Sequence, residues 1–317
     1  MIKAQYTPGS RVGNHMMQYA SLYSLAKRLD YQLTIPPIEG FRNTFEPPAG
    51  GRAFDTPNSP LVIESRHFLH YETIDPHTGR TIVNHECSYF ENIYNFHDRR
   101  NELVSIFTLP PHSLASYAFY RLRAGTLRPT RLTSISPRDI VISLRLGDFL
   151  FVPNATPRWK QRVYSRFLGF EYFEIILRAA RFGRLFITSD EPFHPLVSAF
   201  QKYDPILVRN DSPIKTMAFI NRFNRIAISE STYSWWAAYL TDAEEIYYPI
   251  SKSGLWGINT SWNPHRRAWE TINSLHEEDK DAYLRVDDER YLYVHQATEV
   301  IYKYDDAPGK RRRDNFS

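Results

Sequence analysis

The feature that most constrains the fold is a regular alternation of short apolar segments with longer amphipathic ones after Pro137. The short segments are rich in branched apolar residues and fit buried strands, whereas the longer ones place apolar residues three and four positions apart, which is typical of helices. The expected strands are residues 139–145, 184–188, 205–208, 225–229 and 245–250, and the expected helices are residues 172–181, 193–202, 214–223 and 233–240. Strands and helices in this order predict a parallel sheet with crossover helices.

The first part of the chain shows a weaker form of the same alternation. Short strands are expected at residues 2–6, 61–64 and 81–84, and helices at residues 16–29, 97–107 and 113–125. Residues 36–60 are rich in Pro, Gly and Asn and are expected to form a loop. We therefore predict an α/β protein with two Rossmann-like lobes, each built on a parallel sheet, and a cleft between them.

This pattern divides the chain into three regions. Residues 1–125 are expected to form an N-terminal lobe, and residues 126–270 a C-terminal lobe. Residues 271–317 form an extension with short strands expected at 283–286, 291–294 and 300–304. The extension ends in the basic run 310–313, which is typical of a solvated tail.

Composition removes several classes of function. With 39 Lys and Arg against 35 Asp and Glu, the net charge of +4 lacks the excess of a dedicated nucleic-acid binder. Cys87 is the only cysteine, and His67, His70 and His85 have no third ligand at a recognisable spacing, so no metal or other cofactor is expected. The first residues lack the apolar core of a signal peptide, and no apolar run reaches the roughly 18 residues of a membrane span. We expect a cytoplasmic protein with at most peripheral membrane association.

Candidate site residues follow the expected strands, because ligands of parallel α/β sheets bind beyond the carboxyl ends of the strands. Gly13 and Asn14 follow the first strand, where the glycine would allow close approach of a phosphate or sugar. Arg145 and Asp148 follow the strand at 139–145. They fit either a structural ion pair or an arginine that binds phosphate through two nitrogens.

Two further segments lie at the same kind of position. Ser189 and Asp190 fit the cap of the following helix better than a ligand site. Ser231 and Thr232 fit a helix cap whose hydroxyls and backbone N–H groups could also bind an anion. Trp235 and Trp236 are expected in the core under either interpretation.

Taken together, these segments resemble one family. The sequence from Ser10 to Ala20 is similar to the opening Gly-Asn segment of the α-1,2-fucosyltransferases, glycosyltransferase family 11. Residues 143–148 resemble that family's H-x-R-R-x-D segment, residues 189–191 its S-D-D, and residues 231–240 its S-S/T-F-S-W-W block. Residues 88–91 resemble its G-Y-F-Q segment, and the matches run in the family's order over about residues 1–250.

The resemblance implies a GT-B-like fold and metal-independent, inverting transfer of L-fucose from GDP-β-L-fucose to a hydroxyl of a glycan or oligosaccharide. Arg145 would hold the leaving diphosphate, and Asp148, Glu230 and Glu91 remain open as candidates for the general base. The residues implied in donor binding are Gly13, Asn14, Ser143, Ser189, Asp190, Thr216, Ser231, Thr232, Tyr233 and Ser234. Those implied on the acceptor side are His15 and Glu91.

The chain also departs from the family pattern. Ser143 replaces the family's His, Leu146 its second Arg, and Thr216 an Asp associated with the purine base. The Ser143 and Thr216 positions are the ones that the resemblance implies in nucleotide recognition. A transferase for another nucleotide sugar and a catalytically degenerate sugar- or nucleotide-binding protein therefore remain as alternatives.

Overall fold

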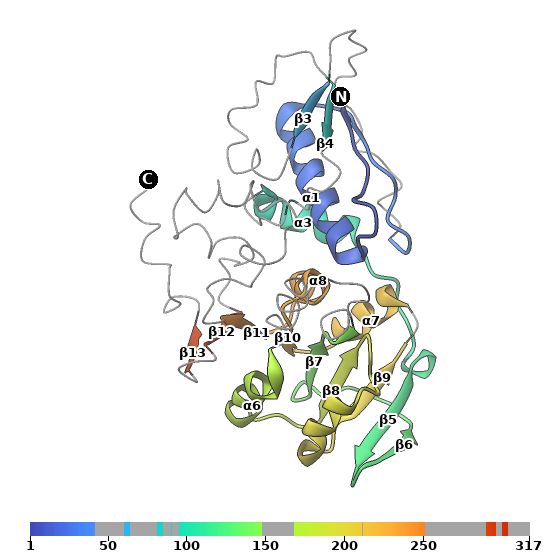
Figure 1. The fold of residues 1–317 in the computed structure, drawn as a ribbon, viewed down its shortest axis with the longest axis vertical. Helices are drawn as coiled ribbons and strands as arrows, with labels where there is room; N and C mark the ends of the chain where they lie inside the picture. Colours follow the sequence, from blue (N-terminus) through green and yellow to red (C-terminus); the bar gives the residue numbers. More distant parts are fainter. Residues whose placement is uncertain are drawn as a thin grey trace, which may run out of the picture. The chain divides into compact units, whose positions relative to one another are not determined.

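The computed structural model describes residues 1–41, 60–63, 81–84, 90, 95–147, 168–210, 212–250, 290–295 and 300–303. These residues fall into two compact units (Figure 1). The first lies within Met1–Leu109, and the second within Pro110–Pro264 and Asp287–Ser317.

The first unit is built on a parallel sheet with strand order β2-β1-β4-β3. Its elements are β1 Ile2–Lys3, α1 Val12–Leu29, β2 Leu33–Thr34, β3 Leu61–Ile63, β4 Ile82–Asn84, the 3-10 turn η4 His97–Arg99 and α3 Arg100–Ile106. Helix α1 is buried over most of its length, so it serves as the core of this unit. It ends at Asp30, whose left-handed backbone (φ 53°) lets its N–H cap Ala26.

The second unit contains a nine-stranded sheet with order β13-β12-β11-β10-β7-β8-β9-β5-β6. The strands from β12 to β9 in this order are parallel, whereas β13, β5 and β6 pair antiparallel at the edges. The strands are β5 Ala118–Arg123, β6 Thr126–Thr130, β7 Ile140–Leu144, β8 Leu185–Ser189, β9 Ile206–Arg209, β10 Arg225–Ile228, β11 Glu245–Ile250, β12 Tyr291–His295 and β13 Val300–Lys303. The helices are η5 Leu114–Ser116, α6 Gly169–Ala179, η6 Pro195–Tyr203, α7 Pro213–Ile220 and α8 Thr232–Tyr239.

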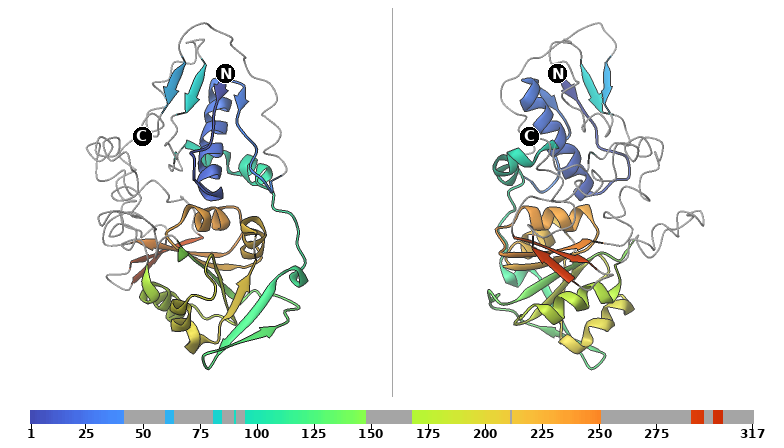
Figure 2. Two further views of the ribbon diagram at one scale, coloured as in Figure 1. Left: turned by 45° about the vertical axis from the view of Figure 1, so that its right-hand side comes forward. Right: turned by 90° about the vertical axis from the view of Figure 1, so that its left-hand side faces the viewer.

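Helices cover both faces of this sheet (Figure 2). Helix α6 and η6 share a cluster of buried side chains with β7 and β8 on one face, and α7 contacts α8 on the other. Aromatic rings fill much of the second layer: Phe186, Phe219 and Phe223 pack edge to face, and Trp235 stacks on Tyr239. The high aromatic content of the chain therefore serves partly to fill the core.

The predicted alternation of strands and helices is confirmed for the described part of the second unit, with one correction and one change of helix type. The helix expected at residues 113–125 is wrong: only Leu114–Ser116 forms a 3-10 turn, and Ala118–Arg123 is strand β5 of the second unit's sheet. The helix expected at 193–202 is the 3-10 helix η6. The strand expected at 283–286 lies outside the described residues.

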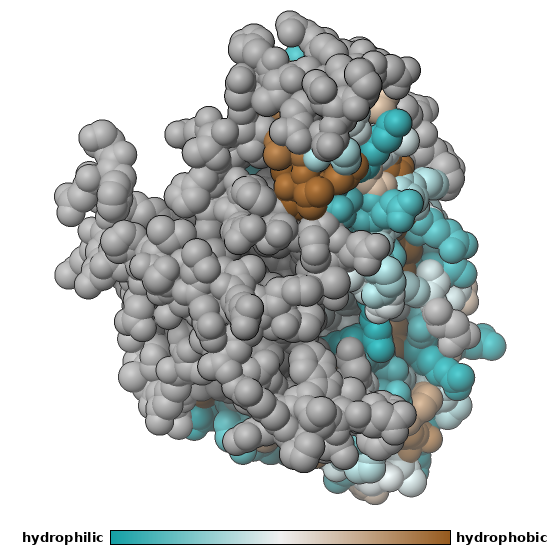
Figure 3. Space-filling model, turned by 45° about the horizontal axis from the view of Figure 1, so that its top comes forward, coloured by the Kyte–Doolittle hydropathy of each residue, from teal (hydrophilic) through white to brown (hydrophobic). Residues whose placement is uncertain are grey.

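On the face drawn in Figure 3, the described residues are mostly hydrophilic, with hydrophobic residues gathered in a few separate places. Four large hydrophobic side chains among the described residues are exposed, namely Val62, Leu127, Phe193 and Leu196. None of the described helices is both long and apolar enough to cross a bilayer.

Candidate functional site

The candidate site lies where the strand order of the second unit reverses. From β7 the chain moves outward through β8 to β9, and then returns to place β10 on the other side of β7. The two crossovers leave the carboxyl ends of β7 and β10 in opposite directions, and in open α/β sheets a crevice forms between two such strand ends. Ligands of open α/β sheets bind at this position, so the geometry of the backbone alone selects the ends of β7 and β10.

Hydroxyl groups join these two strand ends. Ser229 Oγ donates to Ser143 O (2.6 Å) and accepts from the Arg145 N–H (3.0 Å). Ser143 Oγ lies 2.8 Å from Ser234 Oγ on α8. All three serines are buried, so these bonds fix the backbone of β7, β10 and α8 against one another. Sequence reasoning missed Ser229, whose only signal is a small polar residue at the end of an apolar strand.

Arg145 forms an ion pair with Asp190, which follows β8. Arg145 Nη1 lies 2.8 Å from Asp190 Oδ2, and the side chains are 15% and 23% exposed. Asp190 Oδ1 also accepts from the Leu146 N–H at 2.9 Å. The carboxylate therefore holds both the guanidinium and the backbone that carries it. The structural alternative considered for Arg145 had a different partner, Asp148, which lies outside the described residues.

Gly147 is required beside this pair. A Cβ atom at that position would overlap the Asp190 carboxylate. Any larger residue would therefore push Asp190 away from Arg145 and from the Leu146 N–H. The sequence motif contained this glycine, but its spacing gave no indication that Asp190 would occupy the space.

Tyr233 extends the site along α8. Its OH donates to Pro213 O (2.6 Å) at the start of α7, the helix that carries Thr216. Burial raises the pKa of the Tyr233 phenol, and although the Thr216 side chain and the Arg145 charge oppose this rise, the pKa stays above its ordinary value. Tyr233 is therefore a neutral hydrogen-bond donor close to both Arg145 and Asp190.

The amino end of α8 faces the same crevice. Ser231 is the N-cap residue and Thr232 the first helical residue, and both are buried. The first backbone N–H groups of a helix have no acceptor within the helix, so this end is suited to bind an anion. Arg145 follows β7 and pairs with Asp190, which follows β8. Its guanidinium therefore lies at the same end of the parallel sheet as the amino end of α8.

Glu230 lies between these groups but is directed inward. The residue is 2% exposed. Burial raises the pKa of Tyr172, and the charge of Glu230 raises it further, so the carboxylate lies near that phenol in the interior. Tyr172 OH in turn donates toward Ile228 O (3.1 Å) and Tyr247 O (3.3 Å), which joins the carboxyl end of β10 to the middle of β11. The sequence pattern did not indicate that Tyr172 makes these hydrogen bonds.

Leu146 shows how the departure from the family pattern is accommodated. This residue stands where the family has its second arginine, and its side chain is fully buried in the core beneath the sheet ends. Only its backbone N–H contributes to the site. Arg145 is therefore the guanidinium that this segment presents.

The remaining expected residues lie in the first unit, where the predicted loop is a helix. Helix α1 begins at Val12, so Gly13, Asn14 and His15 form its first turn, and the expectation of a helix starting at residue 16 is corrected. His15 stacks on Tyr6 with ring centroids 4.3 Å apart, and burial lowers its pKa despite a bond with the Ser10 backbone. Arg11 caps the helix without a side-chain bond, which explains why the start was not recognised.

The structure thus brings together ten of the expected residues at the carboxyl end of the parallel strands in the second unit's sheet. These are Ser143, Arg145, Ser189, Asp190, Thr216, Glu230, Ser231, Thr232, Tyr233 and Ser234. Asp148 and Glu91 lie outside the described residues. Within the described part of the chain, no three His, Cys, Asp or Glu side chains are grouped to hold a metal ion.

Comparison with known proteins places this site in a family. The chain matches the model of glycosyl transferase family 11 over residues 3–253. It is 28% identical over 254 residues to galactoside alpha-(1,2)-fucosyltransferase 2 of Bos taurus, covering 75% of this chain and 68% of that protein. It is 29% identical over 262 residues to galactoside alpha-(1,2)-fucosyltransferase 1 of Mus musculus, covering 76% of this chain and 64% of that protein. The chain therefore spans about two thirds of the length of these relatives. The match over most of the chain shows that it belongs to glycosyltransferase family 11, as a divergent member, and that it is a glycosyltransferase.

Proposed function

We propose that the protein transfers L-fucose from GDP-β-L-fucose to a hydroxyl of a glycan, forming an α-1,2 linkage with inversion at C1. The observation that carries this proposal is the position of Arg145 at the crevice between β7 and β10, beside the amino end of α8. The names of the relatives support the sugar and the linkage, and they suggest a galactoside as acceptor.

The chemistry follows from where charge develops. The acceptor oxygen attacks C1 while the bond from C1 to the β-phosphate oxygen breaks, and the departing GDP takes the electron pair. Arg145 and the first N–H groups of α8 would stabilise the negative charge on the diphosphate. Removal of one such preorganised donor typically costs about 3–4 kcal/mol in the transition state.

The proton of the acceptor hydroxyl needs a base, and three candidates follow from the sequence. The inward position of Glu230 argues against direct contact with an acceptor that arrives from solvent. Asp148 and Glu91 remain as candidates. Their replacement by Asn and Gln, respectively, distinguishes them, because only the loss of the base should abolish transfer while donor binding persists.

The proposal keeps the organisation that the family resemblance implies. The second unit takes the nucleotide-sugar donor, the first contributes to acceptor binding, and the two are arranged as in GT-B enzymes. It also keeps a reaction that needs no metal ion. The cytoplasmic location expected from the sequence stays a prediction.

Transfer assays test the proposal directly. Purified protein, GDP-fucose and lactose should yield a fucosylated product whose anomeric NMR signal identifies the α-linkage, at the same rate with and without EDTA. Arg145→Ala should abolish transfer, whereas Arg121→Ala, which removes a guanidinium paired with Asp204 far along β5, should not. Activity that requires an added divalent ion would refute metal independence, and a retained β-anomer would refute inversion.

Leu146 and Thr216 favour the second candidate function, a protein that uses another nucleotide or has lost turnover. The buried Leu146 leaves the diphosphate one guanidinium short of the family pattern. If UDP- or dTDP-sugars are transferred in place of GDP-fucose, the transferase proposal stands and the fucosyl proposal fails. If nucleotides bind but no donor is transferred or hydrolysed, the degenerate protein is the correct description.

A further inference from the structure

A second charged region lies outside the candidate site. Residues 103–138 contain no Asp or Glu and five arginines, at positions 121, 123, 128, 131 and 138. The chain as a whole is nearly balanced in charge, so this concentration is local. Three of the five arginines lie on the antiparallel hairpin formed by β5 and β6 at the edge of the nine-stranded sheet.

The register of this hairpin gathers the arginines on one face. Arg121 pairs directly with Arg128, and Arg123 pairs with Thr126. Every second residue of a strand lies on the same face of the sheet, and so do residues directly opposite each other on paired strands. Arg121, Arg123 and Arg128 therefore lie on the same face of the hairpin. Arg121 forms an ion pair with Asp204 at 2.9 Å. Arg123, Arg128 and Arg131 are exposed and form no ion pair within the described part of the chain.

Like charges placed directly across a hairpin are destabilising, so this arrangement is unfavourable for folding alone. A solvated edge needs charge to prevent aggregation, but one lysine or proline is sufficient for that purpose, and Pro129 is already present on β6. The surplus of arginines is therefore not explained by protection of the edge. It is explained if the hairpin contacts an anionic surface.

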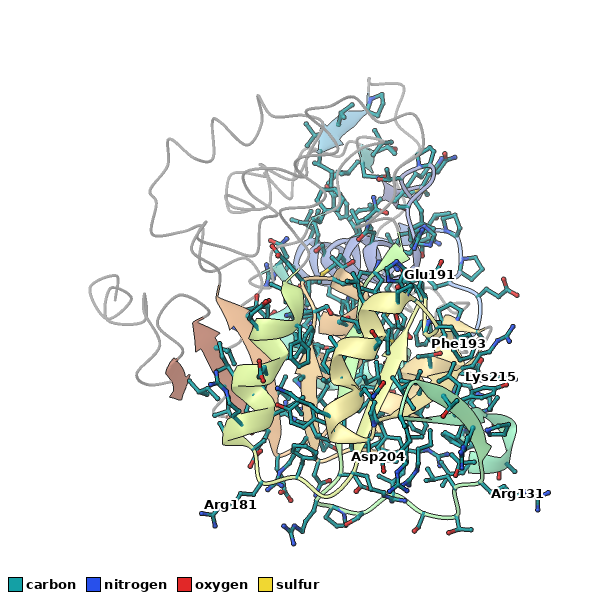
Figure 4. All side chains as sticks on the ribbon, turned by 60° about the horizontal axis from the view of Figure 1, so that its bottom comes forward. Arg131, Arg181, Glu191, Phe193, Asp204 and Lys215 are labelled. Atoms are coloured by element: carbon teal, nitrogen blue, oxygen red, sulfur yellow. The ribbon has the colours of Figure 1, made fainter. Side chains whose placement is uncertain are left out.

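The opposite face of the hairpin is apolar. Leu122 is buried and pairs with Leu127, which is 42% exposed. Tyr120 on the same face packs edge to face against Phe193, which is also 42% exposed. Figure 4 shows Phe193 on the hairpin side of the sheet and Arg131 projecting outward beside the hairpin. The hairpin thus combines free arginines with exposed apolar side chains.

The turn of the hairpin lies at the end of the sheet opposite to the candidate site. Arg121 pairs with Ile206, the first residue of β9, so the chain continues beyond the amino end of β9 into the turn at Ala124 and Gly125. In Figure 4, Asp204 at this end and Glu191 beyond the carboxyl end of β8 mark the two ends of the sheet. A surface bound by the turn would leave the donor crevice open.

We propose that the β5–β6 hairpin docks the protein on an anionic phospholipid surface. The hairpin contacts the surface with its turn first, so that Arg123 and Arg128 on one face contact the headgroups and Leu127 on the other face enters the interface between headgroups and acyl chains. Each arginine near an anionic leaflet strengthens binding by about fivefold. The exposed Leu127 beside Arg123 and Arg128 favours a lipid surface over a nucleic acid, because an interfacial element requires an apolar part beside its charges.

Vesicle co-sedimentation tests the proposal with the full chain. The protein should bind vesicles of phosphatidylglycerol and phosphatidylcholine in equal parts, bind pure phosphatidylcholine vesicles far less, and be released by salt. Arg128→Glu should weaken binding by about tenfold or more because it changes the charge by two units. The new carboxylate would face Arg121, so the hairpin should not lose stability, and the melting temperature checks this.

Two further variants complete the test. Lys3→Glu, an exposed position on β1 with the same change of charge, is the matched control and should bind as the unaltered protein does. Leu127→Trp should show a blue shift of its fluorescence on anionic vesicles. Equal binding to both kinds of vesicle, unchanged binding of Arg128→Glu, or binding to heparin but not to vesicles would each overturn the proposal.

Discussion

At the scale of single residues, the site depends on one guanidinium held in place by neighbours that sequence spacing does not reveal. Arg145 was predicted because it ends a buried strand, and the structure confirms that strand. Its positioning by Asp190 and Ser229 depends on the pairing of β7 with β8 and β10. Such contacts join residues far apart in the sequence, so residue patterns alone could not assign them.

Arg145→Lys should lose most of the activity despite keeping the charge. A lysine ammonium is a point charge and cannot bind Asp190 or a diphosphate with two parallel bonds as a guanidinium can. We expect kcat/KM to fall by about a hundredfold or more, which corresponds to about 3 kcal/mol. A lysine variant with nearly full activity would show that Arg145 acts only through its charge.

Asp190→Asn should tighten the binding of GDP. The ion pair with Arg145 must open before a diphosphate can take the guanidinium, and the neutral amide competes less well than a carboxylate. A half-buried pair of this kind contributes about 1 kcal/mol, so Kd measured by calorimetry should fall by about fivefold. A weaker affinity would instead mean that the Asp190 charge is needed to position Arg145.

Gly147→Ala should destabilise the second unit through Asp190. The added Cβ overlaps the carboxylate, and overpacking of this kind costs about 1–3 kcal/mol in the free energy of unfolding. In an Asp190→Ala background the same substitution should cost little, because the overlap is gone. Denaturant unfolding of both single variants and of the double variant measures this coupling.

At the scale of elements, prediction succeeded where hydrophobic periodicity was strong and failed where one turn decides the structure. Strands β7 to β11 were recognised because they are apolar runs that alternate with helices along the chain. Strand β5 was mistaken for part of a helix because Phe119 and Leu122 also fit a helical spacing. Its turn places Ala124 and Gly125 at positive φ, and alanine gives no warning of such a turn.

The amino ends of β7 and β8 are joined by Asp139, and this contact should control stability in acid. Burial alone would raise the pKa of Asp139, but bonds from Arg184 and from the Ser136 N–H hold it below its ordinary value. A lowered pKa stabilises the fold above the unfolded-state value of about 4, and this contribution is lost as the pH falls through the native value.

Asp139→Asn should therefore lose about 2 kcal/mol of stability at neutral pH. The difference between the variant and the unaltered protein should shrink as the pH falls below about 4, where Asp139 becomes protonated. Urea unfolding at several pH values measures this trend. A difference that is independent of pH would show that the loss comes from packing rather than from the carboxylate.

At the scale of the whole molecule, two compact units predict an uneven response to ligand. The candidate donor-binding residues at the ends of the parallel strands lie in the second unit, whereas Gly13, Asn14 and His15 lie in the first. The alternation of strands and helices predicts two lobes that divide at residue 125, whereas the first compact unit gives way to the second between Leu109 and Pro110. The part played by each unit in catalysis could not be derived from pattern, because it rests on the family resemblance.

Scanning calorimetry with GDP should raise the midpoint of the transition that belongs to the second unit. A ligand present at a hundred times its Kd stabilises the state that binds it by about 2.7 kcal/mol. Arg145→Ala should remove the GDP-dependent shift while leaving the midpoint without ligand nearly unchanged. The same shift with UDP but not with GDP would assign a different base, and an unchanged shift in Arg145→Ala would place the diphosphate elsewhere.

The hydrogen bond between Ser229 and Ser143 joins residues 86 positions apart in the sequence. The site can therefore form only when these two distant segments of the chain pair during folding. Local strand and helix pairs can form while the chain is still being synthesised, but the pairing of β10 with β7 closes a long loop and is correspondingly slow. The crevice, the held guanidinium and the amino end of α8 are completed together by that event. Nucleotide binding therefore reports that this long-range pairing has formed, and a nascent chain that ends before α8 should be unable to bind its donor.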